Sequence, residues 1–152
     1  MNITANFKLK NNPMNPVTIN ATPNEGYEFV NWTENDVELS TETTFEFVPT
    51  KDTTIVGNFQ KKTYMVNVLV EGFGTVSGDG SYQFGDEATL IANPDEHNKF
   101  IGWFKNDELL SNNTEYKFVV NNNTDIVAKF EKIVYNVNLI ANPTDGGTLT
   151  MI

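Results

Sequence analysis

Apolar and polar residues alternate with a period of two along most of the chain. Segments 17–19 (Val-Thr-Ile), 45–47 (Phe-Glu-Phe) and 66–68 (Val-Asn-Val) show this pattern, which is typical of a half-buried β-strand. Gly, Asn and Asp cluster between such runs, as at 78–81 and 121–123, and these residues favour turns. No segment keeps a 3.6-residue period over three turns, so the pattern predicts an all-β protein.

The pattern also repeats along the chain. Segment 21–32 returns at 92–103, an offset of 71 residues, and the ungapped return covers 39 pairs, of which sixteen are identical. Most of the identical residues are apolar or turn residues, which a duplicated fold would keep. The sequence therefore predicts tandem β units, the complete one about 70 residues long. Its predicted strands are 64–70, 74–77, 82–92, 99–104, 114–119 and 124–130.

The repeat divides the chain into four parts. We predict a complete unit at 60–131 and a shortened unit at 8–59, which lacks a counterpart of the hairpin at 74–86. Residues 1–7 match the end of a unit, and residues 132–152 match the start of a further one. We therefore expect the chain to be part of a longer protein.

The last part of the chain corresponds to strands that the shortened unit lacks. Residues 135–149 match 64–76 of the complete unit, with two extra residues between the matched segments. Because an unpaired strand offers open N–H and C=O groups to a partner, we expect 135–149 to pair with a sheet edge. The edge would belong to the same chain or to a neighbouring molecule, and the second case would join molecules head to tail. Alternatively, this segment is loose or caps the complete unit.

Charge and composition exclude several classes of partner. The formal net charge is −10, the isoelectric point is near 4.4, and all ten basic residues are Lys. Binding to nucleic acid or to an anionic membrane needs concentrated positive charge, so neither is expected. No apolar run approaches the roughly 18–20 residues that cross a bilayer, and no signal peptide is visible. The absence of Cys excludes disulfides and thiolate metal sites.

Aromatic residues recur at matched positions of the two units. This spacing favours a core role, because aromatic side chains dominate small cores, although such a row could also stack on sugars or bases. Phe73 and Tyr82 lie near the hairpin that the first unit lacks, and they are the better candidates for ligand contact. The predicted core residues are Phe29, Trp32, Phe47, Phe59, Phe100, Trp103, Phe118 and Phe130.

No constellation of reactive residues accompanies the repeat. His97 is the only histidine and its repeat counterpart is Gly26, so we interpret it as a surface turn residue without catalytic or zinc partners. Asp79, Asp86 and Glu87 could supply oxygen ligands to calcium, but their spacing matches no EF-hand loop. We expect solvated turn acids, and we predict no enzyme activity, no metal and no cofactor.

Several motifs together resemble a known family. They are 64–68, the glycine-rich 74–86, Pro-Asp-Glu at 94–96, Phe-Ile-Gly-Trp at 100–103, an Asn-Asp turn at 106–107 and the closing segment 126–130. This set resembles the internalin B-repeat group, especially its divergent Listeria–Bacteroides type members. The resemblance covers 64–130 as a full unit and 17–59 as a shortened one. It implies a small β-grasp-like fold, strung in tandem on secreted or surface-anchored bacterial proteins, where members serve as stalks and adhesive modules without catalytic residues.

The expected function is therefore a non-catalytic repeat segment of a bacterial cell-surface protein. Such a segment would act as an extracellular spacer or stalk, and it would adhere to a protein or glycan of a host or neighbouring cell. The alternative is a carbohydrate- or peptide-binding module that uses an exposed sheet edge or the hairpin with Phe73 and Tyr82.

Overall fold

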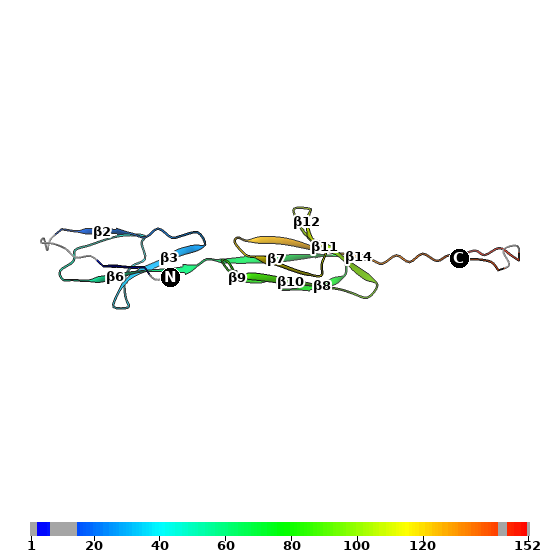
Figure 1. Ribbon diagram of the computed structural model, residues 1–152, viewed down its shortest axis with the longest axis horizontal. Coiled ribbons are helices and arrows are strands. Elements are labelled where there is room, and N and C mark those ends of the chain that lie inside the picture. The colour runs from blue at the N-terminus through cyan, green and yellow to red at the C-terminus, as the bar shows by residue number, and fades with distance from the viewer. Residues whose placement is uncertain (1–2, 7–14, 143–145, 152) are drawn as a thin grey trace.

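The protein forms two β units arranged end to end. The computed structural model describes residues 3–6, 15–142 and 146–151. These residues contain fourteen strands and no helix, and the units lie one after the other along the long axis (Figure 1). The predicted all-β class with tandem repeat units is confirmed.

The second unit is a sandwich of two sheets. One sheet has the strand order β12-β11-β14-β7-β9, and the other has the order β13-β10-β8. The first and last strands of the unit, β7 and β14, lie side by side and run parallel, whereas their other neighbours are antiparallel. The strands are β7 (Thr63–Glu71), β8 (Gly74–Ser77), β9 (Gly80–Gln83), β10 (Glu87–Pro94), β11 (Asn98–Lys105), β12 (Glu108–Ser111), β13 (Glu115–Val119) and β14 (Thr124–Lys132).

The first unit keeps the second half of this architecture. Its strands β2 to β6 correspond to β10 to β14, and it has no counterparts of β7, β8 and β9 among the described residues. Together with β1, the strands of the first unit form a sheet of order β1-β6-β3-β4 and a separate pair β2-β5. The strands are β1 (Ile3–Asn6), β2 (Val17–Asn20), β3 (Tyr27–Glu34), β4 (Val37–Ser40), β5 (Thr44–Phe47) and β6 (Thr54–Lys61).

Strand β1 lies where the first unit would otherwise carry a counterpart of β7. It pairs antiparallel with β6 over four residues, from Ile3 opposite Gly57 to Asn6 opposite Thr54. In the second unit the equivalent edge of β14 carries β7, which is parallel and spans six pairs. The segment whose sequence matches the end of a repeat thus occupies the edge of the incomplete unit, in the opposite direction.

Each unit encloses its own aromatic core. Trp103 is fully buried and Trp32 is 7% exposed. Each indole contacts the phenylalanine three residues earlier, with ring centroids 5.2 Å apart for Phe100 and 5.1 Å apart for Phe29. The indole N–H groups donate to the backbone oxygens of Asn113 and Glu42, at 3.0 and 3.1 Å. The remaining predicted core residues are Phe130, which is buried, and Phe29, Phe47, Phe59, Phe100 and Phe118, which are half-buried and pack against the two clusters.

The structure differs from the predicted strands in two places. The expected strand 82–92 is divided into β9 and β10 by a turn at 84–86. In this turn Gly85 has φ +84°, and Asp86 Oδ2 accepts a hydrogen bond from the Gln83 N–H at 3.0 Å. In addition, β12 was not predicted. It forms a hairpin with β11 through Asn106 and Asp107, whose φ values of 50° and 64° are those of a two-residue type I′ turn.

Candidate functional site

The junction between the units brings residues of both units into contact. Strand β6 ends at Lys61 and β7 begins at Thr63, so Lys62 alone separates the two units. Both strands belong to the larger sheet of their unit. A one-residue connector between two sheet strands leaves little freedom for one unit to turn relative to the other.

Both backbone groups of the connector residue are hydrogen-bonded, one to each unit. The Lys62 N–H donates to the Gly26 carbonyl at 2.8 Å, and the Lys62 carbonyl accepts from the Phe84 N–H at 2.9 Å. Gly26 belongs to the turn before β3, and Phe84 belongs to the turn between β9 and β10. These bonds anchor the two ends of the connector, so that φ and ψ of Lys62 are the dihedral angles between the anchored groups.

Phe84 of the second unit packs directly on the backbone of Gly26 in the first. A Cβ atom at Gly26 would lie only 2.0 Å from the Phe84 ring, and Gly26 has φ +74°. Glycine is therefore needed at this position for two reasons: the positive φ of the turn and the close approach of the Phe84 ring. The ring closes the space between the units with apolar contact.

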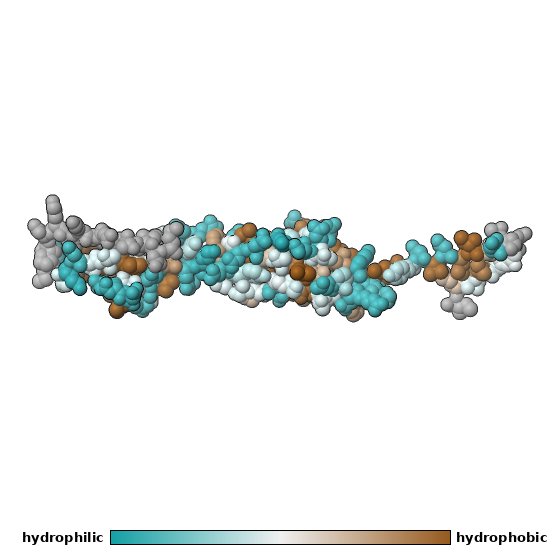
Figure 2. All heavy atoms as spheres, turned by 60° about the horizontal axis from the view of Figure 1, so that its bottom comes forward, coloured by the Kyte–Doolittle hydropathy of each residue, from teal (hydrophilic) through white to brown (hydrophobic). Residues whose placement is uncertain are grey.

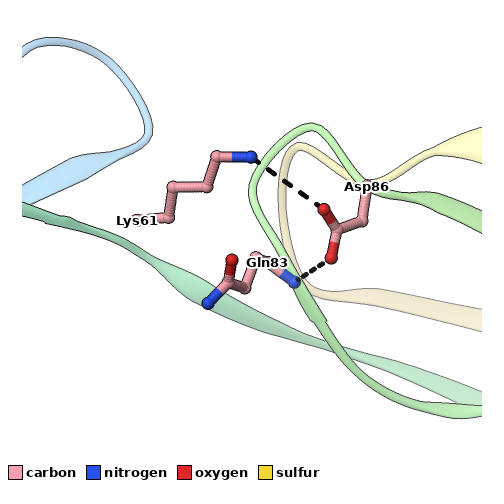
Figure 3. A network of polar contacts seen from close by, with 3 residues as sticks. All are labelled: Lys61, Gln83 and Asp86. Atoms are coloured by element: carbon pink, nitrogen blue, oxygen red, sulfur yellow. Dashed lines mark hydrogen bonds and ion pairs between the residues drawn. The ribbon is translucent and has the colours of Figure 1, made fainter. Parts of the chain in front are cut away.

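An ion pair flanks this contact. Lys61 Nζ of β6 lies 4.0 Å from Asp86 Oδ1 of the second unit, whose other carboxylate oxygen accepts the Gln83 N–H (Figure 3). The two side chains are 37% and 44% exposed. Water and salt screen a pair this exposed, so its contribution is at most about 1 kcal/mol. Asp86 thus braces a turn and links the units.

The far end of the second unit repeats part of the junction. The Ile133 N–H donates to the His97 carbonyl at 2.7 Å, which matches the bond from Lys62 to Gly26. His97 adopts φ 63°, and its Nε2 lies 3.3 Å from Glu96 Oε1 with both side chains largely exposed. The described residues contain no cluster of three or more His, Asp or Glu side chains that could hold a metal ion.

The structure does not bring Phe73 and Tyr82 together. Phe73 follows the end of β7 and is 70% exposed. Tyr82 pairs with Tyr64 at the start of β7, packs against the core and donates its hydroxyl to the Gly78 carbonyl at 2.6 Å. Nine residues of extended chain span about 30 Å. Phe73 and Tyr82 therefore do not form one contact surface, and Phe73 is the more exposed of the two. Their role in ligand contact stays a prediction.

One difference between the repeats could have indicated the junction from the sequence alone. Gly26 and His97 occupy equivalent turns but differ completely in size, and only the glycine faces a following unit whose turn carries Phe84. The importance of Phe84 was missed because the first unit has no counterpart with which to compare it.

Comparison with known proteins identifies the repeat. The sequence model of the divergent InlB B-repeat domain matches residues 13–63 and again residues 64–134. The resemblance seen in the sequence is confirmed. No curated protein and no solved structure matches the chain. In the part of the chain that the structure describes, no helix is long and apolar enough to cross a membrane.

Proposed function

The chain belongs to the divergent InlB B-repeat family, and we propose that it is a non-catalytic spacer of a bacterial cell-surface protein. The family is found in bacterial surface proteins. The proposed location is outside the cell, where the repeats would hold other parts of the protein away from the cell surface.

The junction is the observation that supports this proposal. A spacer must transmit direction from one unit to the next, which needs contacts that fix the angle between them. The one-residue connector, the two backbone hydrogen bonds of Lys62 and the packing of Phe84 on Gly26 supply such contacts. Length then increases by one unit for each repeat, because each unit contacts only its neighbours.

Small-angle X-ray scattering at low protein concentration tests the proposal. The unaltered chain should scatter as a straight rod. Gly26→Ala should shorten the maximum dimension and broaden the distance distribution, because a Cβ at this position cannot coexist with the Phe84 ring. If the wild-type chain scatters as two units on a flexible tether, the spacer proposal is wrong.

Gly80→Ala is the control for this experiment. Gly80 also has a positive φ, +136°, but a Cβ added there meets no atom within 4 Å, and Gly80 lies outside the turn that carries Phe84. Both substitutions strain the backbone, and only Gly26→Ala forces the units apart. Equal loss of the rod shape in both variants would mean that backbone strain, rather than the junction contact, determines the shape.

Adhesion is a second candidate function, and the exposure of Phe73 favours it. An aromatic side chain that is 70% exposed at the tip of a turn can insert into a partner or stack on a sugar. Binding to a glycan array or to cell-surface extracts that is lost in Phe73→Ala, and retained in Leu69→Ala, would support adhesion. Leu69 is a suitable control because it is 62% exposed on β7.

A further inference from the structure

The segment after β14 carries an exposed apolar face. Tyr135, Val137 and Leu139 alternate with polar residues and are 69%, 61% and 46% exposed. Apolar atoms accordingly gather on this segment in Figure 2, whereas the visible face of the second unit is a mixture of hydrophilic and intermediate residues with scattered apolar ones. Described residues after Lys132 form no strand.

The same sequence pattern is a buried strand elsewhere in the molecule. Segment 135–140 corresponds to 64–69 in β7. There Val66, the counterpart of Val137, is fully buried, while Tyr64 and Val68 are half-buried against the core. The residues exposed on this segment thus correspond to the residues of β7 that face the core.

The first unit offers the place where such a strand fits. Its β6 corresponds to β14, and the edge that would receive a parallel strand is covered by the four residues of β1. Its β2 corresponds to β10, which pairs with β8 in the second unit. Among the described residues β2 pairs with β5 alone.

The core residues of the first unit are correspondingly less buried than those of the second. Val17 is half-buried where Ala88 is fully buried, and Pro49 is half-buried where Val120 is 1% exposed. Phe59 is likewise half-buried, whereas its counterpart Phe130 is 6% exposed. Among the described residues, these positions of the first unit are therefore less completely buried than their counterparts under β7 to β9.

We propose that this segment of one molecule completes the first unit of a second molecule. Residues 134–142 would add to β6 as a parallel strand in place of β1, and 147–149, the counterpart of β8, would reach β2. The register of β7 on β14 places Asn138 opposite Thr54 and Leu139 opposite Ile55. The exchange replaces a four-residue antiparallel pairing by a six-residue parallel one and buries Val137.

The acceptor is the first unit of a second copy, because the donor segment starts at the opposite end of the molecule from its own first unit. The segment begins at the end of the second unit that is remote from the first unit (Figure 1). It leaves β14 as β7 leaves β6, with Ile133 bonded to His97 as Lys62 is bonded to Gly26. An added molecule would therefore continue the rod. Such a contact is heterologous and would propagate head to tail.

Sedimentation velocity from micromolar to millimolar concentration tests the inference on the whole chain. We expect dimers and longer species to grow with concentration, and more strongly in high salt, which screens the charge of −10 on each molecule. Val137→Lys should weaken association by more than about 100-fold, because it removes a buried apolar side chain and would bury a charge.

Asn136→Lys is the matched control. It adds the same charge next to Val137 but on the other face of the strand, where the β7 counterpart Met65 is 46% exposed. Association should persist in this variant. Both substitutions lie outside the two units, so circular dichroism should show both variants folded. A wild-type chain that stays monomeric at all concentrations, or equal association in both variants, overturns the proposal.

Cysteine cross-linking identifies the acceptor edge. The chain has no Cys, and adjacent strands lie about 4.8 Å apart, within the reach of a disulfide. Thr54→Cys combined with Asn138→Cys should give a ladder of cross-linked chains under mild oxidation. Thr54→Cys with Leu139→Cys should not, because the two side chains would lie on opposite faces. A cross-linked monomer in place of the ladder would show that the segment folds back in its own chain, which contradicts the exchange.

Discussion

Truncation of the tryptophan at the centre of the second unit should remove about half of that unit's stability. Trp103 is fully buried, contacts Phe100 at 5.2 Å and donates to the Asn113 carbonyl. Burial of an indole removes about 150–250 Å² from water, which at about 25 cal/mol per Å² corresponds to roughly 4–6 kcal/mol. Measured costs of Trp→Ala are about 3–5 kcal/mol. Asn113 is exposed, so water can replace the lost hydrogen bond at little cost.

We therefore expect Trp103→Ala to lower the free energy of unfolding by about 4 kcal/mol. A unit of this size is stable by about 4–10 kcal/mol, so the variant should unfold at a much lower urea concentration. Circular dichroism follows both units, and the fluorescence of Trp32, the only tryptophan left, follows the first unit alone, so a transition seen only by circular dichroism belongs to the second unit.

Phe73→Ala is the control for this experiment. It removes an aromatic ring that is 70% exposed, so it should change the stability by less than about 0.5 kcal/mol. A loss below about 1 kcal/mol in Trp103→Ala, or equal losses in the two variants, would refute the assignment of the core.

The remaining predictions concern the relation between the units. A fragment of residues 60–134 should fold alone and melt above the first unit in the whole chain, because its core is more fully buried; calorimetry of both proteins checks this, and an unfolded fragment would show that the unit boundaries are wrong. Asp86→Asn should leave the rod shape in X-ray scattering intact, since the pair with Lys61 is screened; a bent particle would mean that the ion pair holds the junction.

The tandem all-β organisation could be predicted because it rests on local pattern and on repetition. Alternation at 66–68 and turn residues at 106–107 mark a strand and a turn without any tertiary information. The two tryptophans fall at equivalent positions of the repeat, and both are buried in the structure. These features depend on each unit separately, so the sequence of each unit contains them.

The features that were missed depend on contacts between distant segments. The division of 82–92 into β9 and β10 is an exception, because the turn at 84–86 is closed locally by the hydrogen bond from the Gln83 N–H to Asp86. The similarity of residues 1–7 to the end of a repeat could not predict that β1 pairs antiparallel with β6. This pairing depends on the edge of β6 that the missing counterpart of β7 leaves open. The packing of Phe84 on Gly26 required the relative position of the units.

The central claim is that the junction holds the two units in one fixed orientation. Residual dipolar couplings of the backbone N–H groups, measured for both units in one weakly aligned sample, test it most directly. We predict that a single alignment tensor fits the couplings of both units, as it would for one rigid body. Two tensors of different magnitude or orientation would show that the units move independently about Lys62, and would contradict the spacer function proposed for this chain.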